Sequence, residues 1–255
     1  MDCHSNCTHI PIRLSEFLAL IACLLLAVPI AMSAPSGKPV WINPCGGKEL
    51  GGGEGSQADT IPDNQLLTRI ILASRNALAF AQKFSEAFVG NVFPGRSVTS
   101  HHEEWKHTRY DWLPTEKDIP KTLGETTPDH HLKDLAELEL DAFLLSSYRY
   151  LQTISVGLEQ VHHDKTRHSA QFSEEFAQAQ FKLRQVLCEV ESALTVRAPD
   201  IKIVDVTRTV MASEYRNMKD ETYRDLRDWI IFRDYMNCLE YLTDVCEFFK
   251  KLKDN

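Results

Sequence analysis

The sequence lacks the short motifs of the commonest catalytic sites. It has no Gly-x-Ser-x-Gly elbow for a serine nucleophile and no Gly-x-Gly-x-x-Gly loop for a dinucleotide. The cluster Gly46-Gly47-Lys48 is not a phosphate loop, because Glu49 stands where Ser or Thr must bind magnesium. Downstream of His102, Lys106 replaces the second histidine of a zinc-protease motif. These absences predict a protein that is not an enzyme and that holds no metal or cofactor.

An excess of basic residues is also missing. The 28 Lys and Arg residues are outnumbered by 36 Asp and Glu residues, which gives a formal net charge of −8. Charges of both signs are interspersed along the chain. Nucleic acids and anionic membranes select basic stripes, so neither is expected as a partner.

Long apolar runs are confined to one place, Phe17–Ile30. The run is shorter than the roughly 20 residues that span a bilayer. Arg13 precedes it, and Ala31 and Ser33 follow as small residues of a cleavage site. This order predicts a secretory signal over residues 1–33 and a secreted, extracellular protein without stable membrane insertion after cleavage. An uncleaved signal anchor is the alternative, because the head before Arg13 is long.

Cysteine is sparse once the predicted signal is removed. Four remain, at Cys45, Cys188, Cys238 and Cys246. In an oxidising compartment, four cysteines make two disulfides the default expectation. The one Asn-x-Ser/Thr glycosylation sequon, at Asn6, lies within the predicted signal and would be removed with it.

The remaining chain has two parts. Residues 34–60 are rich in Gly and Pro and are predicted to form a flexible segment, with Cys45 as a tether. Residues 61–255 carry apolar residues at steps of three and four, the period of amphipathic helices. Asp63, Thr127-Pro128 and Ser169 are helix-start signals. The expected helices cover 63–90, 127–162, 169–198 and, most clearly, 229–249, with an earlier start of the last helix at Ser213 as an alternative.

The connections between these helices predict the topology. The first and third are long, at 91–127 and 198–222, and the second is short. A long helix needs a long loop to run parallel to its predecessor, whereas a short loop makes neighbours antiparallel. The pattern predicts an all-α, up-up-down-down long-chain four-helix bundle with two long crossover loops. An irregular helical domain is the alternative. Within the third connection, the β-branched segment Ile201–Val206 is expected to lie extended against the bundle.

Helix geometry limits the disulfide pairings. Cys238 and Cys246 lie eight residues apart on one helix, about 12 Å along its axis, too far for a bridge. Two of three connectivities survive. Parallel third and fourth helices favour Cys188–Cys246 with Cys45–Cys238, the swapped pairing is second, and free buried thiols are the remaining alternative.

One stretch of the sequence resembles a known family. Helix residues Leu132 to Ile154 (LKDLAELELDAFLLSSYRYLQTI) follow a Pro-rich loop containing Trp112-Leu113-Pro114. Together with the signal and the helix layout over residues 61 to 253, this resembles the long-chain helical cytokines of the leukaemia inhibitory factor and ciliary neurotrophic factor class, and the invertebrate Unpaired-type ligands. The latter are basic and glycosylated, whereas the mature chain here is acidic and lacks sequons.

The resemblance implies a monomeric signalling ligand without chemistry of its own. It would bind single-pass, cytokine-type cell-surface receptors and activate JAK/STAT signalling. In the family, receptors bind the outer faces of the first and third helices, the first long loop with the end of the fourth helix, and the start of the fourth helix. The last site uses Phe followed three residues later by Lys. Here Phe232 is followed by Tyr235, so that motif is not carried over.

Aromatic residues in the first long connection are the first interface candidates, although covering the core is the favoured interpretation of them. Aromatic anchors are enriched in binding hot spots, and basic neighbours suit a rim. Exposed positions late in the last helix are expected to complete the surface. The candidate receptor-binding residues are Trp105, Lys106, Arg109, Trp112, Tyr241, Glu247 and Lys250.

Three alternatives remain open. Histidines gather at His101-His102, His130-His131 and His162-His163, where a solvated polar surface is the favoured interpretation over a metal site. A third functional class, an extracellular structural or host-directed effector, is also open, and the second is a secreted carrier of lipid or another apolar ligand. Its cavity would be lined by phenylalanines, namely Phe80, Phe84, Phe88, Phe172, Phe176 and Phe181.

Overall fold

The computed structural model describes residues 35, 37–46, 61–168 and 170–254. The predicted signal, residues 1–33, lies outside the described residues, as do Ser169 and most of the predicted flexible segment. The chain divides into the units Met1–Ser36 and Gly37–Asn255. The second unit contains every helix described below.

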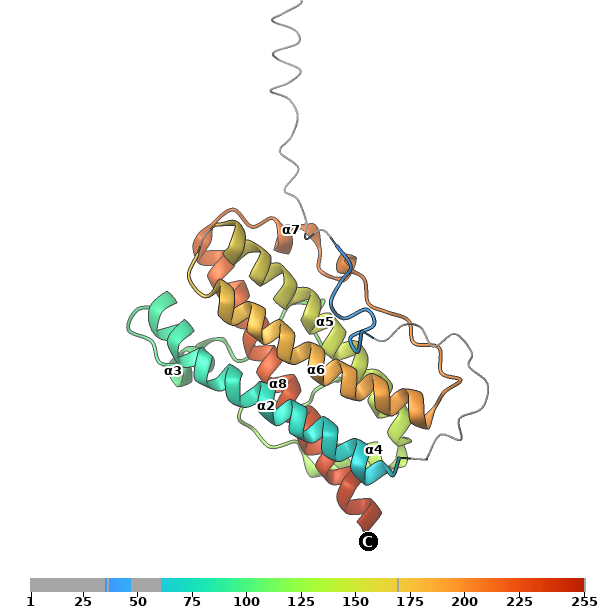
Figure 1. Ribbon diagram of the computed structural model, residues 1–255. Helices are drawn as coiled ribbons and strands as arrows, with labels where there is room; N and C mark the ends of the chain where they lie inside the picture. The colour runs from blue at the N-terminus through green and yellow to red at the C-terminus, as the bar shows by residue number, and fades with distance from the viewer. Residues whose placement is uncertain (1–34, 36, 47–60, 169, 255) are drawn as a thin grey trace, which may run out of the picture. The chain divides into compact units, whose positions relative to one another are not determined.

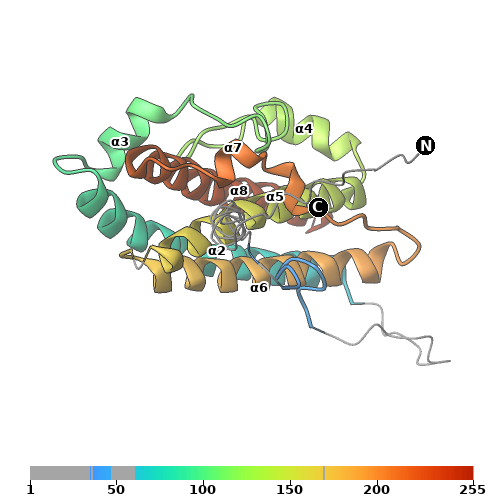
Figure 2. The same cartoon turned by 90° about the horizontal axis from the view of Figure 1, so that it is seen from above.

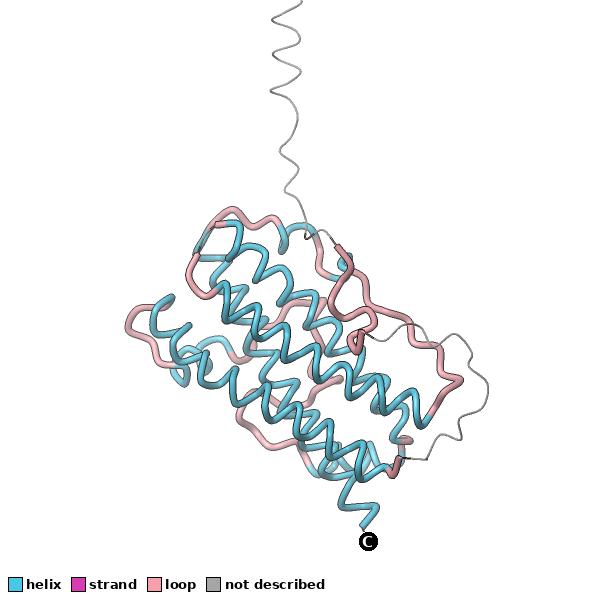
Figure 3. The backbone as a smooth tube through the Cα atoms, in the orientation of Figure 1, coloured by secondary structure: helices cyan, strands magenta, loops and turns pink. Residues whose placement is uncertain are grey.

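The regular structure of the described residues consists of seven α-helices and one short 3-10 helix, without a strand. The all-α prediction is therefore confirmed (Figures 1 and 3). The helices are α2 (Asp63–Val92), α3 (Val98–Trp105), α4 (Asp129–Glu137), α5 (Leu140–Arg167), α6 (Ser173–Arg197), the 3-10 helix η1 (Arg208–Val210), α7 (Ser213–Arg216) and α8 (Glu221–Asp254).

Four helices, α2, α5, α6 and α8, are 25 residues or longer and lie side by side (Figures 1 and 2). Helix α2 packs on α6 and α8, and α5 packs on the same two helices. The three- and four-residue apolar period places Leu67, Ile70, Ala77 and Phe88 of α2 in the core, as expected for an amphipathic helix. The predicted apolar stripes therefore form the contacts among these helices.

Phenylalanine rings fill the centre of the core. The Phe84 ring centroid lies 5.1 Å from those of Phe176 and Phe232, and that of Phe88 lies 5.4 Å from Phe176, all near edge-to-face. Such ring pairs add roughly 0.5–1.5 kcal/mol each beyond area burial. Phe172 joins this cluster from a left-handed backbone conformation (φ 72°) directly before α6.

Helix α8 is covered on all sides over Arg227–Leu239, where every residue is buried. The first long connection supplies part of this cover. Arg233 donates hydrogen bonds to the carbonyl oxygens of Trp105 and Thr108, at 2.6 and 2.7 Å. A helix covered on every side cannot show a polar face, so its charged residues need internal partners.

The predicted second helix is interrupted, contrary to expectation. Leu138 and Glu139 are extended (ψ 138° and 143°) and separate α4 from α5. Because of this break α4 packs on α8 as well as on α5. The Leu135 side chain is thereby buried, while Leu138 at the junction stays 53 % exposed.

Two short helices were not expected as separate elements. Helix α3 lies within the first long connection and begins with a reciprocal capping box between Ser97 and Ser100. Helix α7 begins at Ser213, the alternative start proposed for the last helix, but it ends after one turn. Helix α8 then starts anew, with the Asp220 carboxylate accepting a hydrogen bond from the Tyr223 amide.

Candidate functional site

The predicted interface residues of the first long connection hold that connection in place. Arg109 donates to the carbonyl oxygens of Pro114 (3.4 Å) and Lys121 (3.1 Å), across the loop. Lys106 pairs with Glu103 one helical turn earlier, at 2.8 Å. Trp105 is half-buried and packs against the core. These contacts fix the loop in one conformation.

Trp112 belongs to a half-buried aromatic cluster with Tyr110 and Tyr215 (the aromatic cluster). The ring centroids of Tyr110 and Trp112 are 6.4 Å apart and nearly parallel, and those of Tyr110 and Tyr215 are 4.7 Å apart. Tyr215 comes from α7, so the cluster joins the first long connection to the third. The sequence analysis missed Tyr215 as a member, because it lies 103 positions from Trp112.

The predicted residues of α8 lie elsewhere, and one prediction about them was wrong. Tyr241 was expected to be exposed, but it is 3 % exposed, because α4 and α5 cover it and His131 lies 2.9 Å from its hydroxyl. Glu247 forms an ion pair with Arg75 of α2. Lys250 donates to the Thr68 hydroxyl at 2.9 Å. The seven predicted residues therefore do not form one site.

A buried charge network occupies the first half of α8. The Arg227 guanidinium is fully buried and donates to Asp228 (2.6 Å), Asp164 (2.8 Å) and the Tyr215 carbonyl (2.7 Å). Lys165 donates to Asp225 at 2.7 Å and lies 3.0 Å from Asp228. Every ion in the network has a partner of opposite charge, as buried ions require. The network ties α5 and α7 to α8 and has a structural role.

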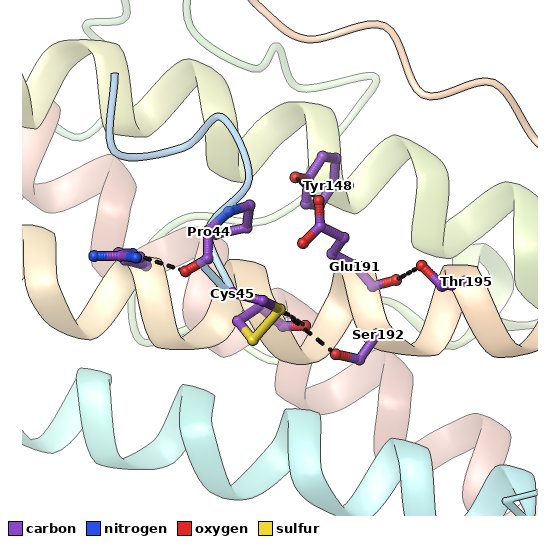
Figure 4. Close-up of a disulfide and its surroundings, with 8 residues drawn as sticks. Pro44, Cys45, Tyr148, Glu191, Ser192 and Thr195 are labelled. Atoms are coloured by element: carbon purple, nitrogen blue, oxygen red, sulfur yellow. Dashed lines mark hydrogen bonds between the residues drawn. A yellow bond between two sulfur atoms is a disulfide. The ribbon is translucent and has the colours of Figure 1, made fainter. Parts of the chain in front are cut away.

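One disulfide joins Cys45 to Cys188 of α6 (Figure 4). Both pairings favoured from the sequence were therefore wrong, because Cys238 and Cys246 are free buried thiols. The helix-geometry argument against a Cys238–Cys246 bridge agrees with this result. What failed was the assumption that all four cysteines pair.

Residues 37–46, the strap, lie against α5 and α6 around this disulfide (Figures 1 and 4). Trp41 is fully buried, and its indole N–H donates to the Val206 carbonyl at 2.7 Å. The Arg184 guanidinium donates to the Pro44 carbonyl at 2.7 Å. The sequence suggested a tether at Cys45, whereas a buried tryptophan also anchors the segment.

His101 is not part of a solvated surface, contrary to expectation. It is 3 % exposed, and its ring is stacked on that of Phe93 with 4.0 Å between centroids. Neither ring nitrogen has a hydrogen-bond partner. Burial lowers the pKa of His101, against the raising influence of Glu104. Among the described residues, no group of three or more His, Cys, Asp or Glu could hold a metal ion.

A groove of about 940 Å³ lies over α5, and we call it the α5 groove. The first long connection forms one wall and the third forms the other. Trp112, a member of the aromatic cluster, lies at the first wall. Other residues that line the groove include Asp111, Thr115, Asp118, Arg149, Tyr150, Lys202, Val204 and Asp205.

Hydrogen bonds join the first-connection wall of the α5 groove to α5 at its floor. The Tyr150 hydroxyl donates to Asp118 at 3.1 Å, and the Thr115 amide and hydroxyl donate to the same carboxylate at 2.8 and 2.7 Å. Burial acts to raise the pKa of Asp118, but these hydrogen bonds outweigh it and lower the pKa below its ordinary value. None of the described residues that line the groove is a histidine or a cysteine.

Within the described part of the chain, no helix is both long and apolar enough to cross a bilayer. Comparison of the chain with protein-family models, with curated proteins and with solved structures finds no match.

Proposed function

We propose that the protein is a secreted, helical, cytokine-like signalling ligand that binds single-pass cell-surface receptors and activates JAK/STAT-type signalling. The observation that carries this proposal is the meeting of both long connections over α5. There they form the α5 groove beside the aromatic cluster of Tyr110, Trp112 and Tyr215. Half-buried aromatic residues beside a rigid depression are typical of binding hot spots in protein interfaces.

The proposed topology is up-up-down-down, with α2 and α5 parallel to each other and antiparallel to α6 and α8. The short link of residues 168–172 between α5 and α6 supports an antiparallel pair. Two long connections, 93–139 and 198–220, are long enough to cross the bundle. Packing of α2 and α5 on the same two helices agrees with this order. Helical cytokines have this arrangement.

Secretion is also part of the proposal. The Cys45–Cys188 disulfide supports it, because such bonds persist in oxidising compartments. The predicted signal over residues 1–33 is the proposed route of export.

The carrier alternative has less support. Four of the six phenylalanines expected to line a cavity, Phe84, Phe88, Phe172 and Phe176, instead pack ring against ring. Close-packed rings leave no room between them for an apolar ligand. Phe181 is 53 % exposed and lies outside this cluster.

The test is to express the full chain in secretory cells, purify it from the medium, and add it to cells with a JAK/STAT pathway. We expect saturable STAT phosphorylation within minutes. Val204→Asp, in the α5 groove, should reduce the response, whereas Leu138→Asp, at the α4–α5 junction, should not. These positions are 71 % and 53 % exposed, so neither change disturbs the core. The absence of a response from folded protein on cells that answer a known helical cytokine would contradict the proposal.

A further inference from the structure

The wall of the α5 groove formed by the third connection contains a non-helical segment with unused backbone groups. The Ile201 amide donates to the Ala198 carbonyl at 3.0 Å, and the Val206 amide donates to the Gln152 side chain at 2.9 Å. Between them, the backbone groups of Lys202–Asp205 make no hydrogen bond to any other described residue. A row of free donors and acceptors in an extended chain is a template for another strand.

The side chains of this segment alternate as they would in an edge strand. Lys202 and Val204 are exposed, with Val204 at 71 %, while Ile203 and Asp205 are half-buried. Ile203 packs against the hydrophobic core. One side of the segment is therefore fixed to the protein, and the other faces outward along the α5 groove.

The charges lining the groove are unequally satisfied. Two of its carboxylates have internal donors, since Asp118 accepts from Thr115 and Tyr150 and Asp205 accepts from Gln152 at 2.6 Å. The third, Asp111, lies near the Tyr215 hydroxyl and adds to burial in raising the pKa of Tyr215. The cationic ends of Arg149 and Lys202 have no hydrogen bond or ion pair to any described residue. The groove therefore offers two positive charges without an ionic partner among the described residues, beside three carboxylates that already have contacts within the protein. A partner with carboxylates would complement them.

We propose that the α5 groove binds an extended, acidic peptide segment of a partner protein. The segment adds as a strand along Lys202–Asp205, and its carboxylates pair with Arg149 and Lys202. Its apolar residues lie against Val204 and Trp112. This assignment rests on the proposed function in one respect, since the partner it describes is the receptor.

The test uses the full chain, secreted and purified, as bait for a displayed library of random linear 12-residue peptides. We expect the enriched peptides to carry Asp or Glu among apolar, β-branched residues. Amide hydrogen exchange of the complex should show slower exchange at residues 202–205 than in the free protein. The Arg149→Glu/Lys202→Glu variant should bind the best peptide about tenfold more weakly or worse, because two attractive contacts become repulsive.

The matched control is Lys133→Glu/Lys219→Glu, which changes the net charge equally at two exposed lysines outside the groove. It should bind the peptide as the unmodified protein does. The inference is overturned if no peptide is enriched, if both double variants lose binding equally, or if protection maps elsewhere. In those cases Lys202 serves only to keep an edge segment from pairing with other chains.

The failure of this inference differs from the failure of the proposed function. If the protein triggers STAT phosphorylation and Arg149→Glu/Lys202→Glu does so equally well, the receptor uses another surface and only the groove assignment falls. If no STAT response occurs but the acidic peptide binds and protects residues 202–205, the result supports the groove assignment and contradicts the signalling role.

Discussion

Gly157 of α5 lies directly beneath the ring of Trp112. A Cβ atom added at Gly157 would stand 3.0 Å from Cη2 of Trp112 and 2.8 Å from Cγ2 of Ile231 in α8. Glycine within a helix costs about 1 kcal/mol relative to alanine. At this position it lets the first long connection and α8 approach α5 closely, so that Trp112 can reach the α5 groove.

The first prediction concerns this close approach. Gly157→Ala should lower the free energy of unfolding by about 1–2 kcal/mol, because the strain of overpacking exceeds the gain in helix propensity. Gly90→Ala is the control, since Gly90 also lies in a helix but nothing lies within 4 Å of an added Cβ. That change should be neutral or stabilising. Urea unfolding monitored by circular dichroism measures both, and stabilisation by Gly157→Ala would contradict the packing argument.

The second prediction compares a buried and an exposed ion pair. Arg227→Met leaves Asp164 and Asp228 buried without the guanidinium and should destabilise the protein by about 3–5 kcal/mol. Arg75→Met breaks the ion pair between Arg75 and Glu247, whose side chains are 59 % and 33 % exposed, respectively. This change should alter the free energy of unfolding by less than about 1 kcal/mol. Guanidinium unfolding curves of the two variants provide the comparison. Equal effects would show that burial does not set the strength of these pairs.

The third prediction is a pH dependence due to His101. Burial lowers its pKa below the ordinary 6.5, so the folded state binds fewer protons than the unfolded state. The free energy of unfolding must then fall as the pH drops through the unfolded value near 6.5, and the loss is complete below the folded pKa. His101→Phe removes this proton and keeps the stacking on Phe93. It should therefore raise stability more at pH 5 than at pH 7.

Thermal melts at the two pH values measure this effect. His107→Phe changes an exposed histidine of the same connection and should leave the pH dependence unaltered. The interpretation fails if His101→Phe and the unmodified protein lose stability in parallel on acidification.

The fourth prediction concerns the cysteines. Burial raises the pKa of Cys238 to about 12 and raises that of Cys246 as well, so neither thiol should react with iodoacetamide in the folded protein. Peptide mass mapping should find both alkylated after unfolding without reductant. Cys45 and Cys188 should react only after reduction. Alkylation of Cys238 in the native state would contradict its burial.

The fifth prediction is that the Cys45–Cys188 disulfide stabilises the folded protein. It links residues 143 positions apart, so Cys45→Ser should lower the free energy of unfolding by about 2–4 kcal/mol. The matched change Cys238→Ser probes a thiol without a bridge, and its effect should persist under reducing conditions. The effect of Cys45→Ser should vanish there, because the bond is then absent from both proteins.

The sequence by itself determined the helical class and the inner faces of the long helices. The reason is that helix periodicity is local: Ile70, Ala77, Phe84 and Phe88 share one face of α2 wherever that helix packs. Local chemistry also excluded a bridge between Cys238 and Cys246.

The tertiary structure alone decided what depends on distant segments. Cys45 pairs with Cys188 because the buried Trp41 fixes the strap beside α6, and no local pattern predicts that docking. Tyr241 is buried because α4 turns across α8. The α5 groove brings Trp112 and Val204 to the same surface from two different connections. These contacts arise from packing between segments far apart in the chain. A sequence pattern shows the composition and spacing of such segments but not which of them meet.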